Sequence, residues 1–421
     1  MRKMKDSGIE WIGEIPEGWR TINPKALFTQ RKDKAQKGER QLTSSQQYGI
    51  LYQDDYMELT GSKVVTVEKD FDILKHVEAG DFVISMRSFQ GGLEYSTKPG
   101  AISSAYIMLV PNLELVYPRF YRWLLKSSVY IDALQRTTNM VRDGQAMRYS
   151  NFAQVRLFTL PLDEQKSRAD FLDLECSSID KILFKTRSSI EEYKKLKQAV
   201  ITQAVTKGVR GEREMKDSGV EWIGEIPKEW DILNLVAHTS MLTPMRDRPE
   251  NLDGPIPWIR IEDFDGKYIS SSKASLGVSK ETVRSMNLKI YPVGTILCTS
   301  SCIMGKCAIV SRELVSNQRF IGIIPDQNTC ENFLYYLMLS NSERMNYLAT
   351  GALQANLSRS SFEHLKVQFP SYQEQKEISD YLDTKCAEID KLIAKKEQLV
   401  KELESYKKSL IYEVVTGKRE V

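Results

Sequence analysis

Residues 164–181 read Glu-Gln-Lys-Ser-Arg-Ala-Asp-Phe-Leu-Asp-Leu-Glu-Cys-Ser-Ser-Ile-Asp-Lys, and they decide the fold because the stretch recurs, altered, at 374–391. Both copies open with Glu-Gln-Lys, and both carry a Cys and then an Ile-Asp-Lys at positions 210 apart. The two stretches continue to about 206 and 416 without Pro or Gly and are rich in Lys and Glu. Two long helices of the same kind are therefore predicted.

Seam-type residues in the two stretches recur every three or four positions. A 3.5-residue apolar period marks the seam between supercoiled helices, and about 40 residues make a rod of roughly 60 Å. Because the same steps occur twice, we predict that the two helices pack antiparallel within one chain. A coiled coil between chains and a solvent-facing helix without a partner are the alternatives. The predicted seam comprises Ile179, Ile182, Tyr193, Leu196 and Val200, then Ile389, Leu392, Leu399, Leu403, Tyr406 and Leu410, with Thr186, Ser189 and Lys396 as polar members.

A second repeat precedes each globular stretch. Residues 5–19 return at 216–230 with changes only at Val220, Lys228 and Glu229, and the two copies hold four of the six Trp. A Gly- and Pro-broken segment with paired Trp is predicted to be a short packed connector with buried indoles; an aromatic ligand cage is the alternative. If the duplication closes on itself, residues 415–417 should lie beside residues 5–19.

Between connector and helix, both copies change to strand-like runs followed by one helical stretch. Sequence similarity is strong in connector and helix but weak in these globular parts. We predict an α+β protein with two similar mixed α/β domains, joined by a pair of long antiparallel coiled-coil helices in a pseudo-twofold internal duplication. The expected strands are 64–67, 81–86 and 105–110, then 257–261, 294–299, 308–310 and 320–324; the expected helices are 119–134 and 332–348. The expected segments are 1–158, 159–211, 212–367 and 368–421: connector with first domain, first long helix, second connector with second domain, second long helix.

Composition sets the outer limits. At 421 residues with 41% hydrophobic and 27% charged residues, the chain suits two to four soluble domains. The net charge of +3 is too small to indicate a nucleic-acid partner by itself. Any DNA-binding surface must be a local patch. No 18-residue apolar run and no signal-peptide core occur, so we expect no membrane association. Six Cys without framework spacing indicate reduced thiols in the cytoplasm.

Two loops in each globular part carry polar side chains that suit base edges and phosphates. One loop follows a Gly-Asp or Gly-Thr strand start, and the other follows the predicted helix. Arg and Lys suit guanine, Gln and Asn suit adenine, and Ser suits either a base or a phosphate; a solvated polar turn is the alternative. The candidate residues are Arg87, Ser88, Gln90, Arg142, Gln145, Arg148 and Tyr149 in the first part, and Ser300, Ser301, Lys306, Gln354, Asn356 and Arg359 in the second.

Signals for catalysis are weak. Asp163, Glu164 and Lys166 have the spacing of a metal-dependent nuclease fragment, but the second copy lacks the first carboxylate, which favours helix-start chemistry. The four Cys between 298 and 330 contain no CxxC pair, so buried thiols are favoured over a zinc site. No phosphate-binding GxxxxGK[ST] or GxGxxG and no amino-methyltransferase tetrapeptide occurs. We expect no catalytic residues and no metal in this chain.

The layout as a whole resembles the specificity (S) subunit of type I restriction–modification systems. The resemblance runs the whole length and rests on the connectors 6–19 and 217–230, the helix starts 161–166 and 370–376, and the helix ends 204–208 and 414–418. It implies a non-catalytic DNA-recognition subunit in which each domain reads one half of a bipartite, asymmetric double-stranded DNA target.

The same resemblance implies that the partners carry the chemistry. Two methyltransferase (modification) subunits would dock on the helices and methylate adenine N6 with S-adenosylmethionine. Restriction subunits would join through them and use ATP and Mg. A coiled-coil adaptor without DNA specificity and an autonomous nuclease are the rival functions.

Overall fold

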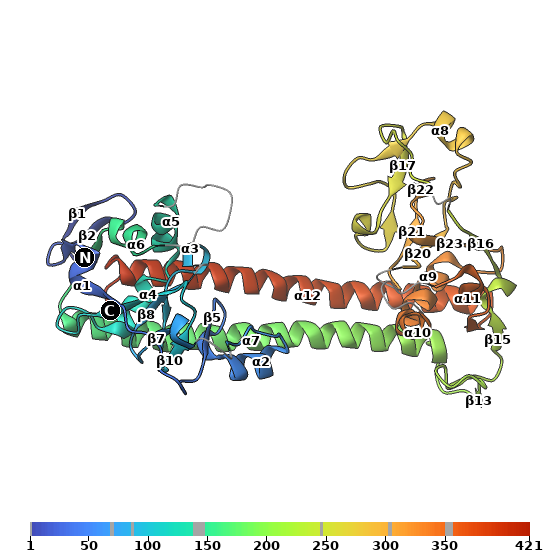
Figure 1. The fold of residues 1–421 in the computed structure, drawn as a ribbon. Coiled ribbons are helices and arrows are strands. Elements are labelled where there is room, and N and C mark those ends of the chain that lie inside the picture. Colours follow the sequence, from blue (N-terminus) through green and yellow to red (C-terminus); the bar gives the residue numbers. More distant parts are fainter. Residues whose placement is uncertain are drawn as a thin grey trace. The chain divides into compact units, whose positions relative to one another are not determined.

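The computed structural model describes residues 2–67, 71–85, 88–137, 148–244, 247–301, 305–349 and 357–421. The chain divides into two compact units, residues 1–187 with 398–421 and residues 188–397. The long helices α7 (Leu162–Lys207) and α12 (Tyr372–Val415) each contribute to both units (Figure 1). Each unit holds a connector hairpin, a mixed α/β domain and one part of each long helix, so the fold is α+β. The four segment boundaries given above stay a prediction.

The first unit is built around a four-stranded antiparallel sheet in the order β4-β11-β8-β9. A pair of strands, β3 and β12, joins the end of the connector to the start of α7. Its strands are β1 (Met4–Ile9), β2 (Gly13–Pro16), β3 (Arg20–Ile22), β4 (Phe28–Arg31), β5 (Leu42–Ser45), β6 (Gly49–Tyr52), β7 (Lys75–Val77), β8 (Phe82–Ile84), β9 (Glu94–Tyr95), β10 (Gly100–Ile102), β11 (Ile107–Pro111) and β12 (Leu157–Thr159). Its shorter helices are α1 (Pro24–Leu27), α2 (Gln53–Thr60), η1 (Phe71–Ile73), α3 (Ser88–Gly91), α4 (Pro118–Leu124), α5 (Ser128–Arg136) and α6 (Tyr149–Gln154).

The second unit repeats this plan with a five-stranded sheet in the order β16-β23-β20-β21-β18. The pair β15–β24 takes the place of β3–β12, and a three-stranded sheet β19-β17-β22 is added. Its strands are β13 (Met215–Asp217), β14 (Glu225–Pro227), β15 (Asp231–Asn234), β16 (Thr239–Leu242), β17 (Ile256–Ile259), β18 (Tyr268–Ile269), β19 (Gly277–Val278), β20 (Ile296–Thr299), β21 (Cys307–Val310), β22 (Val315–Ser316), β23 (Phe320–Pro325) and β24 (Lys366–Phe369). Its shorter helices are η2 (Leu235–Ala237), η3 (Ile261–Asp263), α8 (Lys280–Ser285), α9 (Glu331–Ser340), α10 (Ser342–Leu348) and α11 (Arg359–Glu363).

Most of the predicted elements are present with shifted ends. The exception among the strands is 64–67, which has no regular structure and is held by Gln41, whose side chain bonds both the N–H and the C=O of Val67. Each predicted domain helix is broken into two, α4 with α5 and α9 with α10. The breaks fall where Ser127 donates to Leu124 O and where Asn341 donates to Leu337 O, because these side chains satisfy carbonyls at a helix end.

The long helices pair antiparallel within each unit. In the first unit Lys407 binds Asp180 at 2.6 Å, and Arg187 forms an ion pair with Glu404. In the second unit Lys197 binds Asp390 at 2.7 Å. Residue numbers rise along one helix as they fall along the partner, so the antiparallel intrachain pairing predicted from the repeat is confirmed.

Along each helix, the predicted seam residues alternate between buried or half-buried ones and exposed ones. At the exposed positions the seam lies one residue further along the helix. Ile179, Ile389 and Leu410 are buried, and Tyr193, Val200 and Leu403 are half-buried. In contrast, five predicted members are between 40% and 49% exposed: Ile182, Leu196, Leu392, Leu399 and Tyr406. At three of these five places the next residue is also apolar and lies further inward: Leu183, Ile393 and Val400. Such apolar pairs let either residue satisfy the period, and the packing geometry chooses the second.

The end of α12 lies against the first connector, as the duplication predicts. Gly417 follows the helix with a φ of +76°, and a Cβ there would lie 2.5 Å from Pro16 Cγ. Arg168 is buried and donates to Val414 O at 2.8 Å and to Arg419 O at 2.9 Å. The first connector therefore packs against the end of α12. The second connector has the equivalent place at the end of α7, to which it is joined covalently after Gly208.

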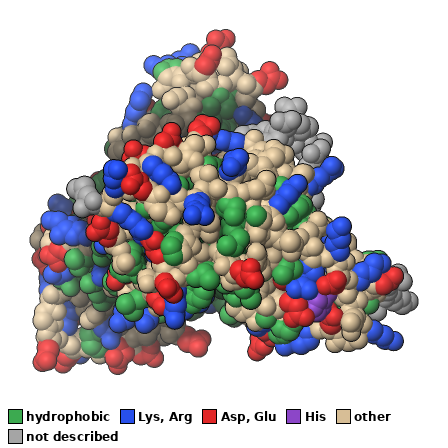
Figure 2. All heavy atoms as spheres, turned by 90° about the vertical axis from the view of Figure 1, so that its left-hand side faces the viewer, with side chains coloured by type: hydrophobic (Ala, Val, Ile, Leu, Met, Phe, Trp, Pro, Cys, Tyr) green, Lys and Arg blue, Asp and Glu red, His purple; other side chains and the backbone are tan. Residues whose placement is uncertain are grey.

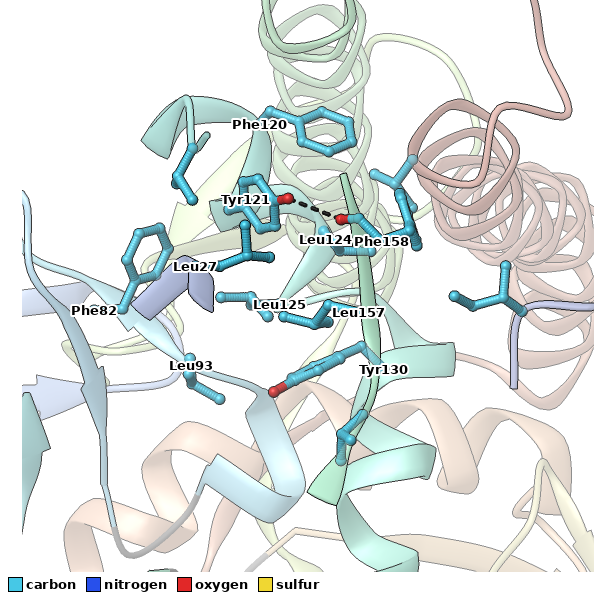
Figure 3. Close-up of a cluster of buried hydrophobic side chains, with 14 of the residues drawn as sticks. Leu27, Phe82, Leu93, Phe120, Tyr121, Leu124, Leu125, Tyr130, Leu157 and Phe158 are labelled. Carbon is cyan, nitrogen blue, oxygen red and sulfur yellow. Dashed lines mark hydrogen bonds between the residues drawn. The ribbon is translucent and has the colours of Figure 1, made fainter. Parts of the chain in front are cut away.

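Two large apolar clusters form the cores, one in each unit. In the first unit, side chains of β8, α4, α5 and β12 pack together with the start of α7 and the end of α12, and Tyr121 donates from its hydroxyl to Phe158 O at 2.8 Å (Figure 3). In the second unit, α9 packs with β20 and β23 and with the end of α7 and the start of α12. The domains are thus fixed to the helices by continuous cores.

Candidate nucleic-acid interface

The repeated Glu-Gln at the start of each long helix attaches a domain to it. Gln165 accepts a hydrogen bond from Tyr117 N at 2.7 Å and donates to Leu115 O at 2.8 Å and Leu160 O at 2.9 Å. Gln375 accepts from Cys330 N at 2.8 Å and donates to Pro370 O and Asn328 O. Both Gln side chains are buried. The motif therefore holds the strand-to-helix turn of each domain.

The Glu of the same motif binds the connector. Trp19 Nε1 donates to Glu164 Oε2 at 3.1 Å, and Trp230 Nε1 donates to Glu374 Oε2 at 3.0 Å. Arg2 and Arg213 form ion pairs with the same two carboxylates. Trp19 and Trp230 are buried as predicted, but Trp222 is 44% exposed, so that indole contradicts the prediction. These roles explain the helix-start carboxylate as a structural group.

Hydrogen bonds hold the pKa of Glu164 below its ordinary value. Burial raises this pKa, but hydrogen bonds from Arg2, Arg168 and Trp19 lower it by more, and the pKa lies below its ordinary value of 4.5. The folded state therefore favours the charged carboxylate.

A third matched position is attached differently in the two units. Asp173 accepts hydrogen bonds from Trp123 Nε1 at 2.7 Å and from Arg119 Nε at 2.9 Å. Its copy Asp383 accepts from the Tyr336 hydroxyl at 2.6 Å and pairs with Lys267. The helix residue is the same and the domain residues differ, so divergence lies in the domains.

One glycine in each unit presses the first candidate loop against the turn between the two domain helices. Gly92 has a φ of +77°, and a Cβ there would lie 2.4 Å from Leu125 O. Gly305 has a φ of +79°, and a Cβ there would lie 2.3 Å from Ser342 Cβ. Both positions need glycine for the backbone angle and for the close approach. The two candidate loops therefore occupy equivalent places.

In the second unit the structure brings the two candidate loops together. Ser300 O accepts a hydrogen bond from Leu357 N at 2.9 Å. A hollow of about 440 Å³ lies at this junction, lined by both polar and apolar side chains. It is lined by Thr243, Pro244, Ser300, Gln318, Phe320, Ile321, Leu357, Ser358 and Arg359. Arg359 is exposed and pairs with Glu363, and Lys306 is exposed.

Two of the serine candidates are wrong as surface contacts. Ser88 is 1% exposed, and its hydroxyl accepts a hydrogen bond from Ser85 N at 2.8 Å, so it shapes the turn before α3. Ser301 is 8% exposed. A sequence pattern cannot separate a serine that closes a turn from one that faces solvent.

The remaining candidates of the first unit have mixed roles. Gln90 and Arg148 are exposed. Tyr149 is half-buried, donates from its hydroxyl to Phe28 O at 3.1 Å and packs against Phe152, and burial raises its pKa. It therefore holds the start of α6 against β4. Arg87, Arg142, Gln145, Gln354 and Asn356 lie outside the described residues.

Charge is mixed on the face that Figure 2 shows, where Lys and Arg side chains are interspersed with Asp and Glu. The local DNA-binding patch stays a prediction. In the described ranges no three His, Cys, Asp or Glu side chains are grouped as metal ligands. Cys298 and Cys307 are buried on paired strands with their sulfurs 2.9 Å apart, and burial raises the pKa of Cys298.

Sequence reasoning missed Thr243, Gln318 and Arg319, which lie at or beside the hollow. The only signal was their place next to strands, at the end of 239–242 and before 320–325. It could not be used without the order of the strands in the sheet.

A family model matches the second half of the chain. Residues 231–402 match the family described as "Type I restriction modification DNA specificity domain". This part of the chain is therefore similar to a DNA specificity domain of restriction–modification systems.

Relatives extend the match over the whole chain. The MjaIX specificity subunit of Methanocaldococcus jannaschii is 34% identical over 181 residues, which are 41% of this chain and 41% of the relative. The putative MjaX specificity subunit of the same organism is 24% identical and covers 97% of this chain and 95% of the relative. The chain is thus similar to type I restriction–modification specificity subunits over nearly its whole length.

Solved structures share the fold. A chain from work on complex assembly and conformational transition of the type I R-M system has a TM-score of 0.71 at 12% identity and covers 96% of this chain and 99% of its own. The HsdS subunit of Thermoanaerobacter tengcongensis has a TM-score of 0.53 at 13% identity, with coverage of 96% and 98%. Within the described ranges, no helix has the length and apolar character needed to cross a bilayer.

Proposed function

We propose that this chain is the DNA sequence-recognition subunit of a type I restriction–modification complex and performs no catalysis itself. Each domain reads one half of a bipartite, asymmetric target on double-stranded DNA. The long helices dock two adenine-N6 methyltransferase subunits and, through them, restriction subunits in the cytoplasm. S-adenosylmethionine, ATP and Mg act on those partners.

One observation carries the proposal: the same contacts fix both domains to the long helices, but the candidate DNA-binding loops of the two domains differ in sequence. The Glu, Gln, Trp and Arg that fix domain to helix are the same in both units, at Glu164 and Glu374 for example. Gly92 and Gly305 fix loops at equivalent places, but the loop sequences differ. Two equivalent frames with different reading surfaces suit two different half-sites.

The helix surfaces support partner docking. Phe184 is 74% exposed and Leu174 is 67% exposed on the part of α7 in the first unit. A groove of about 640 Å³ there is lined by α7 and the end of α4, including Trp123, Lys181 and Phe184. Exposed apolar side chains rimmed by charges are typical of protein interfaces. The five residues displaced from the seam are further exposed apolar side chains on the long helices, three in the first unit and two in the second.

Mapping methylated adenines tests the function. The chain is co-expressed with a type I methyltransferase subunit in cells without other adenine methylation. We expect methylation at one split, asymmetric motif that is absent without this chain. Methylation without a motif, or none with a folded complex, would contradict the proposal.

The rival functions give different results in the same experiment. A structural adaptor predicts no salt-dependent DNA binding even with the methyltransferase present. A nuclease predicts metal-dependent cleavage by the isolated chain.

A further inference from the structure

The turn at Gln318 and Arg319 lies directly beside Ser300, a candidate DNA contact. β20 and β23 are antiparallel neighbours with Thr299 opposite Phe320, so the residue after β20 meets the residue before β23. Ser300 N donates to Arg319 O at 2.9 Å. Because Ser300 O accepts from Leu357 N, the backbone of Ser300 ties the turn to both candidate loops.

The turn is held by hydrogen bonds of its main chain, one of them with the Asn317 side chain, and the side chains of Gln318 and Arg319 stay available. Asn317 Oδ1 accepts from Arg319 N at 3.1 Å, which is the Asx turn that sets a tight bend before a strand. Gln318 and Arg319 are exposed. Among the described residues, neither side chain has an ion pair or a hydrogen-bond partner. Arg359 at the same rim is engaged by Glu363 at 2.7 Å.

The chemistry of the pair suits base edges. An Arg fork reads guanine O6 and N7, and a Gln amide reads adenine N6 and N7. Because the backbone of the turn is already fixed, only the side-chain rotamers of the pair would be ordered on binding. Phe320 and Ile321, which follow the turn directly, are buried on β23 and fix the end of the turn to the sheet.

We propose that Gln318 and Arg319 form a third base-reading segment of the second domain, beside the loops at Ser300 and Arg359. The inference rests on the proposed function and assigns part of its specificity to a segment outside those loops. Arg319 discriminates guanine, and Gln318 discriminates adenine, in one half-site only.

Variants of the full chain, co-expressed with the methyltransferase subunit, test the assignment. The readout is the methylated motif found by sequencing. In Arg319→Ala and Gln318→Ala we expect discrimination to fall by roughly tenfold at one position each of a single half-site, with the other half-site unchanged. Arg319→Lys keeps the charge but loses the fork, so we expect it to relax the motif as Arg319→Ala does.

Arg312→Ala is the control for loss of an exposed arginine in the same domain, although Arg312 also donates to Pro255 O at 3.1 Å. Arg312 is exposed and follows β21 at the end of the strands away from Ser300. It should leave the motif unchanged.

Each outcome separates the two claims. If the wild-type complex methylates no defined motif, the proposed function fails. If the wild type has a defined motif and the Arg319 and Gln318 variants keep every position of it, the further inference alone fails. A uniform loss of methylation in Arg319→Ala that Arg319→Lys restores would make Arg319 a phosphate contact and would also overturn it.

Discussion

Lys407 on α12 binds Asp180 on α7 at 2.6 Å, and an equivalent ion pair occurs in the second unit, where α7 provides the Lys and α12 provides the Asp. Adding 210 to Asp180 gives Asp390, and subtracting 210 from Lys407 gives Lys197, which bind each other at 2.7 Å. An ion pair that recurs with the roles of the two helices exchanged requires two copies of one helix packed antiparallel. The duplication is therefore present in side-chain contacts as well as in sequence.

Adjacent residues on α7 distinguish the seam from the surface. Leu183 is 5% exposed and Ile182 is 48% exposed. We expect Leu183→Ala to destabilise the first unit by about 2–5 kcal/mol, because it leaves a cavity, and Ile182→Ala to change stability by less than about 0.5 kcal/mol. Denaturant unfolding followed by helix content measures both. Equal effects would place the seam between the two residues.

The buried glutamines give a second matched pair. Gln375→Ala leaves Cys330 N and two carbonyls without partners, so we expect a cost of about 1–3 kcal/mol to the second unit. Lys376 is next to it and exposed, so Lys376→Ala should leave the stability of the second unit unchanged. Hydrogen exchange at the 326–332 turn reports the change. Protection there that is unaffected by Gln375→Ala would mean that the turn is held by packing alone.

The sequence was sufficient for the features that repeat. The helices, the connectors and the buried Trp19 and Trp230 follow from apolar period and turn chemistry, which are local. The seam failed at Ile182 because its neighbour Leu183 is equally apolar, and only the partner helix decides between them. Ser88 failed because its role depends on a hydrogen bond to Ser85 N. Gln318 could not be predicted as a candidate DNA contact, because its position beside Ser300 depends on the order of the strands in the sheet, which is a long-range property.

Glycines at the loop base should control each half-site separately. Gly305→Ala would place a methyl group against Ser342 and strain a φ of +79°, so the loop must move. We expect the motif to relax or vanish in one half only, and Gly92→Ala to do the same in the other half. Sequencing of methylated DNA measures both. Gly266 has a φ of +90° and nothing within 4 Å of a Cβ, so Gly266→Ala controls for backbone strain. Loss of both half-sites in either loop variant would contradict separate reading.

His76 should make the folding stability of the first unit depend on pH near neutrality. It lies on β7 with Nδ1 2.9 Å from Glu39 Oε2 and Nε2 3.0 Å from Glu78 Oε1. Burial lowers its pKa, but the two carboxylates raise it by more, and the pKa lies above its ordinary value of 6.5. A raised pKa in the folded state means that the unit binds a proton more tightly than the unfolded chain does.

The stabilisation is therefore complete below the unfolded pKa and is lost as the pH rises through the folded pKa. Hydrogen exchange in β7 and β10 should show less protection at about pH 8 than at about pH 6, after correction for the intrinsic rate. His76→Gln should remove this difference, and Glu39→Gln should reduce it. An unchanged difference in His76→Gln would assign the titration to another group, since the variant keeps a polar side chain but carries no proton that titrates in this range.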